Sequence, residues 1–480
     1  MSDLESVMWS VEKDPALRSD FTNLTILDTA PDPARLMAMV ERMIAAMPRL
    51  DQRVKSTPLH IAPPRWEDDP QLNLEYHIRR VAIPPPGSMR ALFDAAAQLA
   101  ATPFDRQRPL WEFTLLEGLE GGRAGFLQKL HHTITDGVGG IKLSAAMIDF
   151  ERNPPDVADL NAELRAQQRH DRLANPIPQT SFASELWSGI AAAASTQIRR
   201  TRSVVGAAST LATHPQHVPN VGRSLWNMVN SVQRQVVVGP RGYSLLFAPR
   251  SLGRRYDVLS VPFDQVKQAS KAHGVTVNDV FVYAMSRGIA AYHAAFGETL
   301  EHLRMAMPIN LRNRPGQHGA NAFAPVRIVL PVSLGDLQEG LAATHDTLKS
   351  IRQEPALEAL GSIAGAAGML PTSALISLTR QQTKTIDFAT SNLRGASMHL
   401  FMAGARIERT IPLGPRTNAP LNITVMSYAG AFEHGIHSDP AAITDPELLV
   451  RCIEEAWNEL LAPHRKSVTS RNRQRGRSVT

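Results

Sequence analysis

The chain has 480 residues, of which 43% are hydrophobic, and this length predicts two domains rather than one core. Six of the 51 basic side chains lie in the tail 464–480, so the other residues balance 45 basic against 45 acidic side chains. This balance argues against a nucleic-acid partner, and a single cysteine, Cys452, excludes a disulfide framework and favours a reducing compartment.

The first 165 residues alternate strand-like and helix-like runs. Hydrophobic periodicity predicts a strand over 23–27, helices over 34–47 and 89–101, and a buried strand over 124–130. Glycines after this last strand open a predicted helix over 141–150. These elements predict an N-terminal α/β domain over residues 1–165.

The composition changes in the middle of the chain. Residues 166–245 are rich in alanine and polar residues and punctuated by prolines, which predicts a partly helical crossover linker between domains. Between residues 182 and 234 the segment has five arginines, one acidic residue and two tryptophans. Such a segment fits a helix on a lipid surface, and it fits at least as well a helix packed on its own protein.

The alternation of strands and helices resumes after about residue 245. The last strand-like runs cover 387–392, 397–407 and 421–430, and a final helix covers 446–461. Earlier elements of this half are predicted as strands over 258–262, 304–308 and 326–332 and helices over 263–273, 276–291 and 337–353. We therefore predict a second α/β domain of similar build over 246–463, followed by a basic disordered tail over 464–480.

The sequence offers no clear membrane or secretion segment. The N-terminus is acidic and lacks the apolar core of a signal peptide. The uncharged stretch 359–379 is long enough to span a bilayer, but glycines, serines and Pro371 dilute it, so we predict a helix pair broken at Pro371. The expectation is a cytoplasmic protein. Contact of its basic tail with the inner membrane or with lipid inclusions and plain solubility remain alternatives.

Two adjacent histidines, His131 and His132, follow the predicted strand 124–130 and precede Asp136 and Gly137. Histidine is the side chain best suited to take a proton near neutral pH, and Gly137 lets the backbone turn close to a ligand. Three interpretations compete. The pair provides a general base with a structural aspartate, it binds a metal, or it is a satisfied pair of core histidines.

Other catalytic patterns have little support. One cysteine and no His-Glu-x-x-His helix leave a metal site short of ligands, and His434, His437 and Asp439 are predicted to lie in solvent at a strand end. No Gly-x-Ser-x-Gly elbow, Walker loop or Gly-x-Gly-x-x-Gly turn occurs. We therefore expect no metal, no ATP and no permanently bound cofactor.

Several motifs together resemble the bacterial wax ester synthase/diacylglycerol acyltransferase family, within the coenzyme A-dependent acyltransferases that resemble chloramphenicol acetyltransferase. The resemblance covers about residues 1–463. It is carried by residues 2–15, Pro48-Arg49-Leu50 with Arg53, Pro109-Leu110-Trp111-Glu112, His131-His132 through Asp136-Gly137, Val277-Asn278-Asp279-Val280, Pro308 to Arg312, Ser391-Asn392, and Leu421 to Tyr428.

The resemblance implies two similar chloramphenicol acetyltransferase-like domains, joined by the crossover linker, with the active site at their interface. It implies transfer of a long-chain acyl group from acyl-coenzyme A, as co-substrate, to diacylglycerol or a fatty alcohol. His132 is then the general base, Asp136 holds the loop through a buried arginine such as Arg53, and His131 is structural.

The remaining site residues are assigned with alternatives. Asn278 or backbone amides would stabilise the oxyanion, while a cap or first-turn role is the structural alternative for Asn278. Trp111, Arg312 and Asn392 are predicted to bind substrate, although Trp111 is by default a core aromatic.

The chain departs from the family near the predicted acceptor site. Asn310 stands where serine is usual, Asn321 follows Ala320 in an irregular stretch, and Leu-Arg-Gly-Ala replaces Val-Pro-Gly-Pro after Asn392. These departures leave the acceptor open, so a glycolipid or polyketide hydroxyl is an alternative. The alternative from another class is a catalytically silent lipid-binding protein.

Overall fold

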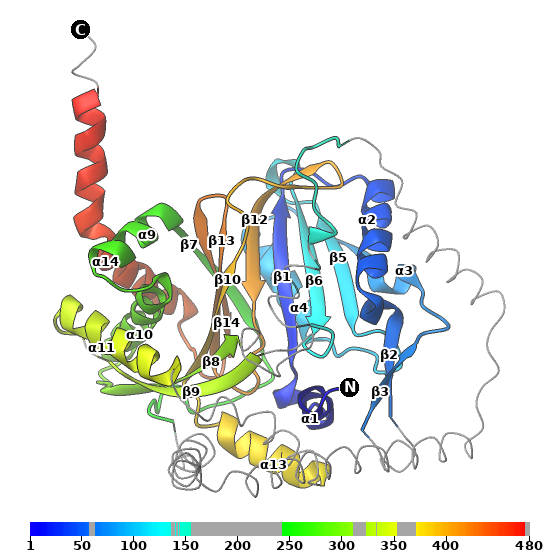
Figure 1. Ribbon diagram of the computed structural model, residues 1–480, viewed down its shortest axis with the longest axis horizontal. Helices are drawn as coiled ribbons and strands as arrows, with labels where there is room; N and C mark the ends of the chain where they lie inside the picture. Colours follow the sequence, from blue (N-terminus) through cyan, green and yellow to red (C-terminus); the bar gives the residue numbers. More distant parts are fainter. Residues whose placement is uncertain are drawn as a thin grey trace, which may run out of the picture.

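The computed structural model describes residues 1–56, 63–135, 140, 143, 145–154, 242–310, 323–332, 334–352 and 371–475 of the chain. Two six-stranded sheets stand side by side in this part of the chain (Figure 1). Residues 166–241 of the predicted linker lie outside the described residues.

The first sheet is built mainly from the N-terminal half. Its order is β11-β12-β1-β6-β5-β4, and β1 runs antiparallel to both β12 and β6. The strands are β1 (Asp20–Leu27), β4 (Ile78–Ala82), β5 (Trp111–Glu117), β6 (Ala124–His131), β11 (Phe401–Met402) and β12 (Ala405–Leu413).

Two helices cover opposite faces of this sheet. Helix α2 (Pro33–Ala46) is capped by Asp32 and buries Met39 and Val40 in a core that includes Phe113 and Phe126. Helix α4 (Met89–Ala101) is capped by Ser88 and contributes Leu92 to a different core. The predicted boundaries of both helices agree with the structure to within one residue, because their periodicity and caps are local signals.

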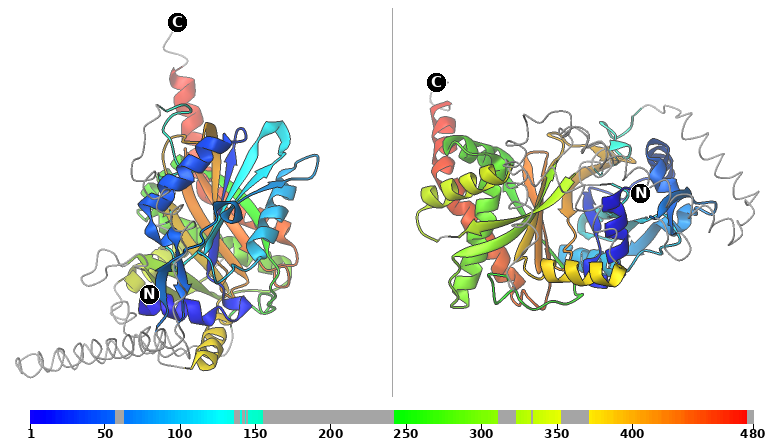
Figure 2. Two further views of the ribbon diagram at one scale, coloured as in Figure 1. Left: turned by 90° about the vertical axis from the view of Figure 1, so that its right-hand side faces the viewer. Right: turned by 60° about the horizontal axis from the view of Figure 1, so that its bottom comes forward.

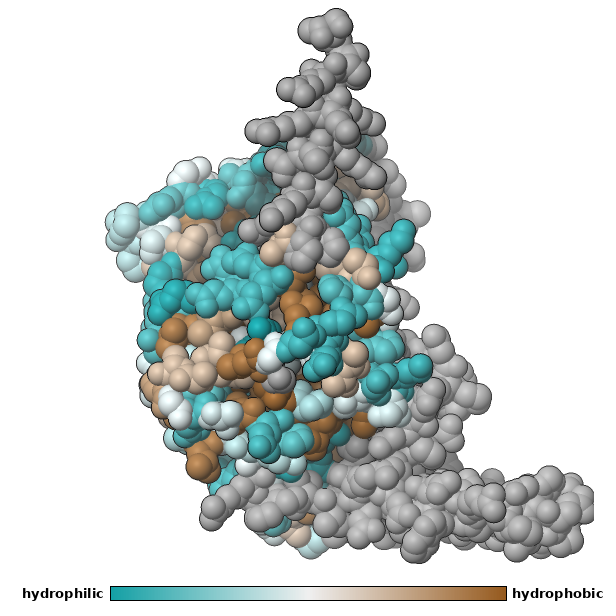
Figure 3. All heavy atoms as spheres, turned by 90° about the vertical axis from the view of Figure 1, so that its left-hand side faces the viewer, coloured by the Kyte–Doolittle hydropathy of each residue, from teal (hydrophilic) through white to brown (hydrophobic). Residues whose placement is uncertain are grey.

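The second sheet is formed by the C-terminal half, in the order β7-β14-β13-β10-β8-β9. Its outer face carries four helices, and the side of the molecule shown in Figure 3 has hydrophilic side chains interspersed with apolar ones. The strands are β7 (Arg255–Pro262), β8 (His302–Asn310), β9 (Phe323–Pro331), β10 (Phe388–Arg394), β13 (Leu421–Tyr428) and β14 (Ala431–Ser438), and the helices are α9 (Phe263–Ala272), α10 (Val277–Ala295), α11 (Leu337–Arg352) and α14 (Pro446–Arg475).

The two halves are interlocked rather than merely adjacent. Strands β11 and β12 belong to the range predicted as the C-terminal domain, yet they pair within the first sheet. Beside β12, Gly435 of β14 lies so close to the Pro412 carbonyl that a Cβ atom would overlap it. Across the same junction, Arg254 forms an ion pair with Asp20 at 2.8 Å. The division at residue 246 therefore follows the chain but not the sheets.

Smaller elements close one end of the molecule. Helix α1 (Asp3–Val11) lies beside α13 (Thr372–Thr383) beneath the two sheets (Figures 1 and 2). A short hairpin of β2 (Gln52–Lys55) and β3 (Arg65–Asp68) and the single-turn α3 (Leu74–His77) flank the first sheet. Helix α13 starts directly after Pro371, where the sequence predicts a break.

Three predictions about the C-terminal half were wrong. The single strand over 397–407 is interrupted by a turn in which Ala403 and Gly404 have positive φ. Helix α14 continues to Arg475, into the predicted disordered tail, and no proline or glycine occurs between residues 464 and 475. His434, His437 and Asp439 are buried, because β14 is an inner strand of its sheet rather than an exposed end.

In the described part of the chain, no helix combines the length and apolar character that crossing a membrane requires. The same residues contain no group of three or more metal-binding side chains. His434 instead contacts the Trp457 indole and two backbone carbonyls, and Asp439 pairs with Arg416 at 2.7 Å.

Candidate active site

His131 and His132 stand where β6 ends and the chain turns. The backbone N–H of His132 donates to the Ser19 carbonyl at 3.1 Å, and the N–H of Ile134 donates to the His131 carbonyl at 2.9 Å. Thr133, Ile134 and Thr135 are buried, so the turn is held inside the protein. The strand-to-turn geometry predicted from the sequence is therefore present.

The two imidazoles have different surroundings. The ring of His131 is 2% exposed, and its Nε2 lies 2.6 Å from the Glu12 carboxylate. The ring of His132 is half-buried and packs against Phe21, with 4.8 Å between the ring centres. Of the two histidines, His132 is the more exposed.

The stretch after the turn is described only in part. Asp136 and Gly137 lie outside the described residues, and so does any contact between Asp136 and Arg53. Arg53 itself approaches Glu67 at 3.3 Å. Gly140 is helical, and a Cβ on it would be 3.7 Å from the Phe21 ring, so the helix begins close to the ring that packs on His132.

Several of the motif residues hold the histidine turn in place. Arg49 donates to the Thr133 carbonyl at 2.8 Å and pairs with Glu5 of α1 at 2.6 Å. The next residue, Leu50, accepts a hydrogen bond at 2.8 Å from the indole N–H of Trp111. Segments that carry the sequence resemblance therefore meet around the histidine turn.

Trp111 lies in the core of the first half. Its side chain is fully buried, stacks on His77 with 4.4 Å between ring centres, and uses its single N–H on Leu50. Burial lowers the pKa of His77 to about 4, although its bond to the Trp111 carbonyl opposes this shift. These contacts favour the core interpretation of Trp111 over a substrate-binding one.

A second group of predicted residues meets in the other half. Asn392 of β10 donates to the side-chain carbonyl of Asn278 at 3.4 Å, and the Asn278 amide lies 3.9 Å from the sulfur of Met307. Thr276, rather than Asn278, caps helix α10, and Asp279 completes the capping box. The Asn278 amide is therefore available for a role other than capping.

The strands beneath this group diverge. Parallel strands β8 and β10 pair only at Phe388 with Met305 and at Ala389 with Ala306. Met307 and Asn392 lie just beyond this pairing, toward the carboxyl ends of the strands, the side on which α/β proteins commonly bind ligands. Arg312 and Asn321 lie outside the described residues, as do the side-chain atoms of Asn310.

Charged residues missed by the sequence analysis surround the base of the turn. Asp20 pairs in register with His131, and its carboxylate meets Arg254 from the other half. Burial raises the pKa of Asp20, but the Arg254 guanidinium brings it below its usual value. These residues are 234 positions apart, so no local pattern could join them.

Two cavities are outlined by described residues, and neither is lined by His132, Asn278 or Asn392. One of about 90 Å³ adjoins His131, Glu12, Asp20, Arg18 and Arg106. The other, of about 320 Å³, lies between α4, β7 and α14.

Comparisons with known proteins agree with one another. Residues 1–281 match the model of the wax ester synthase/diacylglycerol acyltransferase catalytic domain, and residues 319–461 match that of its C-terminal domain. A putative diacylglycerol O-acyltransferase of Mycobacterium tuberculosis is 30% identical over 467 residues, which cover 96% of this chain and 91% of that protein.

Solved structures show the same fold. The wax ester synthase/diacylglycerol acyltransferase from Marinobacter aquaeolei superposes with a TM-score of 0.59 at 21% identity, covering 92% of this chain and 94% of that one. The first condensation domain of the calcium-dependent antibiotic synthetase, bound to a substrate analogue, gives 0.57 at 15% identity and covers 96% of each chain. The predicted two-domain, chloramphenicol acetyltransferase-like α/β fold is confirmed. The chain belongs to the wax ester synthase/diacylglycerol acyltransferase family.

Proposed function

We propose that the protein transfers a long-chain acyl group from acyl-coenzyme A to a lipid alcohol, with His132 as the general base. The observation that carries this proposal is the half-buried His132 ring on a turn whose backbone is fixed by Ser19. A fixed imidazole that remains reachable is what proton abstraction from a hydroxyl requires.

The chemistry needs no covalent enzyme intermediate, because a thioester is already activated. His132 would remove the hydroxyl proton while the alcohol oxygen attacks the thioester carbonyl carbon. The carbon–sulfur bond then breaks, and the imidazolium returns the proton to the departing thiolate of coenzyme A. General-base catalysis of this kind contributes about 10² to 10⁴-fold, and holding both substrates together adds to it.

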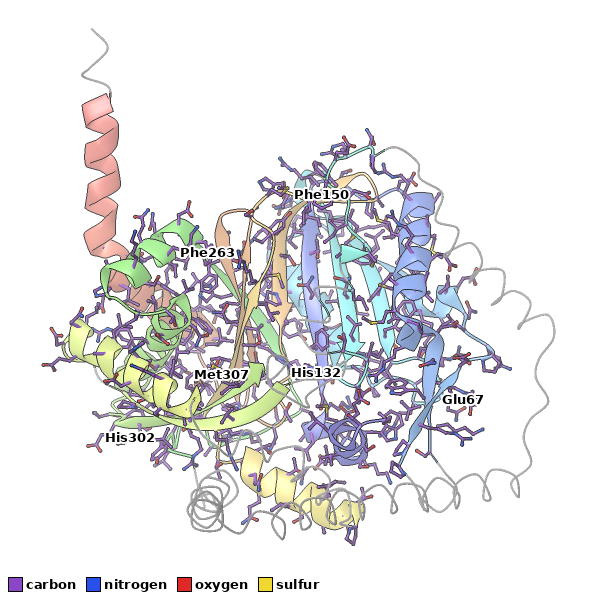
Figure 4. The ribbon with its side chains drawn as sticks, in the orientation of Figure 1. Glu67, His132, Phe150, Phe263, His302 and Met307 are labelled. Carbon is purple, nitrogen blue, oxygen red and sulfur yellow. The ribbon has the colours of Figure 1, made fainter. Side chains whose placement is uncertain are left out.

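Asn278 and Asn392 support a binding role for the second half. Figure 4 shows Met307, which lies next to Asn278, at about the same level of the molecule as His132. The Asn278 side-chain NH₂ group is a donor for a substrate carbonyl or a developing oxyanion. Asn392 orients this side chain by donating a hydrogen bond to its carbonyl oxygen. We propose that the reacting carbonyl lies between the two halves.

The acceptor is proposed to be diacylglycerol, a fatty alcohol, or both. Both alcohols partition into bilayers and lipid inclusions, so contact with such a surface during turnover is part of the proposal. The alternative acceptors, a glycolipid or polyketide hydroxyl, would use the same base.

Thiol release from a long-chain acyl-coenzyme A tests the proposal. It is measured with no acceptor, with dioleoylglycerol and with hexadecanol, for the wild-type chain and for His132→Ala. We expect acceptor-dependent release that falls at least about 100-fold in the variant. A loss of less than about tenfold would contradict base catalysis, and absence of release with every acceptor would favour a silent lipid-binding protein.

A further inference from the structure

The buried carboxylate of Glu12, at the end of helix α1, contacts the histidine turn. Glu12, the residue that ends this helix, has a side chain that is 9% exposed. One carboxylate oxygen accepts a hydrogen bond from the Ser19 backbone N–H at 2.6 Å. The other lies 2.6 Å from Nε2 of His131, as a close ion-pair contact rather than a well-aligned hydrogen bond.

Both ring nitrogens of His131 have polar neighbours. The Thr133 backbone N–H donates to Nδ1 at 3.1 Å, and the Thr133 hydroxyl oxygen lies 2.6 Å from the same nitrogen. Nε2 faces the Glu12 carboxylate, which is an acceptor, and this arrangement favours a proton on Nε2. This ring is held at both nitrogens, and its orientation is fixed by the carboxylate on one side and the turn on the other.

Glu12 reaches His132 by two short routes. Ser19 donates its N–H to Glu12 and accepts the N–H of His132 through its carbonyl. His131 contacts Glu12 through its ring and is bonded covalently to His132. Both routes act on the backbone that sets the position of the His132 ring.

A second arm of the same helix restrains the other side of the turn. Glu5 is 1% exposed and pairs with Arg49, which donates to the Thr133 carbonyl. Glu5 and Glu12 are seven residues apart, about two helical turns, so they face the same side of α1. The helix thus contacts the turn before and after His132.

We propose that Glu12 is a positioning residue, which fixes the turn that carries His132 by accepting from the Ser19 N–H and holding the His131 ring at the same time. Two donors converge on this side chain, and only a carboxylate offers two acceptor oxygens. A glutamine would satisfy one donor and present its own N–H groups to the other. The cost of burying the charge is reduced by Arg106, whose pKa is lowered by burial and raised in part by Glu12.

The experiment compares Glu12→Gln with Asp14→Asn in the full chain, using thiol release from long-chain acyl-coenzyme A with a lipid alcohol. Asp14 is a matched control, because it is also buried and lies two residues from Glu12. Its carboxylate forms an ion pair with Arg380 of α13 and accepts from the Ala16 N–H, and neither contact involves His131. This inference rests on the proposed role of His132, so His132→Ala is assayed in parallel.

We expect Glu12→Gln to lower kcat about 100-fold, the loss typical of a misplaced catalytic group, with each KM changed less than about threefold. Asp14→Asn should keep the wild-type kcat, while its melting temperature should fall at least as far as that of Glu12→Gln. Combining Glu12→Gln with His131→Asn should lower kcat little beyond the larger single effect, since the contact between the two side chains is already lost in either single variant.

A kcat of Glu12→Gln within about threefold of wild type, or an equal kcat loss in Asp14→Asn, would overturn the inference. Should Glu12→Gln not fold, Glu12→Asp decides the question: a kcat about tenfold lower at unchanged KM supports the role, and wild-type kcat contradicts it. If His132→Ala is inactive while Glu12→Gln is normal, only the role of Glu12 fails. If His132→Ala is also normal, the proposed function fails.

Discussion

Arg254 and Asp20 form a buried ion pair at 2.8 Å that joins the C-terminal half to the strand beside His131. Their side chains are only 11% and 4% exposed. Removing one partner of such a pair leaves the other charge buried without compensation, which commonly costs about 3–5 kcal/mol. The pair therefore matters more as a link between the halves than as a simple surface contact.

Asp20→Asn should lower the free energy of unfolding by about 3 kcal/mol or more at pH 7. Because the folded-state pKa of Asp20 is lowered, its contribution is present above the ordinary carboxyl pKa and is lost as the pH falls below it. Denaturant midpoints measure the effect. Glu447→Gln breaks the exposed pair with Arg255 and should cost less than about 1 kcal/mol, so equal costs would contradict the interpretation.

Acid should destabilise the protein through His434. Burial lowers the pKa of this ring to about 4, although its contacts with the Phe432 and Leu259 carbonyls oppose the shift. The Nε2 atom accepts a hydrogen bond from the Trp457 indole N–H. The unfolded chain binds the proton near pH 6.5, so stability is complete above that pH and falls as the pH drops toward 4. We expect a loss of about 2 kcal/mol between pH 7 and pH 5 from this residue.

The variant His434→Gln removes this titration. Its denaturant midpoint should be lower than wild type at pH 7 but should change less between pH 7 and pH 5. His399, an exposed histidine, provides the control, and His399→Gln should leave the wild-type pH dependence intact. An unchanged slope in His434→Gln would show that other groups cause the acid sensitivity.

Trp111→Phe distinguishes a core residue from a wall of the acyl channel. The change leaves the buried Leu50 carbonyl without its donor, so we expect a cost of about 1–3 kcal/mol and an unchanged preference among acyl chain lengths. Phe113→Leu, in the same strand and core, alters packing alone. A shifted chain-length preference with normal stability would instead place Trp111 in the channel.

Gly435→Ala tests how closely the two sheets meet. The new methyl group would overlap the Pro412 carbonyl, and we expect a cost above about 3 kcal/mol. Gly297→Ala is a useful comparison, because its φ of 76° is strained for alanine while no atom lies within 4 Å of the new Cβ. That variant should cost about 1–2 kcal/mol, and the reverse order would refute the contact.

Local signals in the sequence were sufficient for most of the elements. Helices α2 and α4 and strand β6 could be predicted because periodicity and caps depend on neighbouring residues. The pairing of β12 with β1 could not be predicted, since no local sequence pattern specifies which strands pair. His434 was predicted to lie in solvent because its segment resembled the end of a strand, but it belongs to β14, an inner strand whose residues are almost all buried.

The candidate site likewise contains residues that local motifs could identify and one that they could not. His132 and the Asn278–Asn392 pair could be identified from motifs, and the structure brings the two asparagines together. Glu12 was missed, because a glutamate at a helix end normally indicates a solvated surface. Its burial depends on Ser19 and His131, whose approach requires the completed sheet.

The place of β12 between β11 and β1 has a consequence for biosynthesis. During translation, β1 emerges early but lacks one neighbour until residue 413 has left the ribosome. Its unpaired edge therefore persists through the synthesis of most of the chain, and such edges recruit other strands. The nascent protein depends on rapid late closure or on chaperone cover, and a truncated N-terminal half would be expected to aggregate rather than form a small independent enzyme.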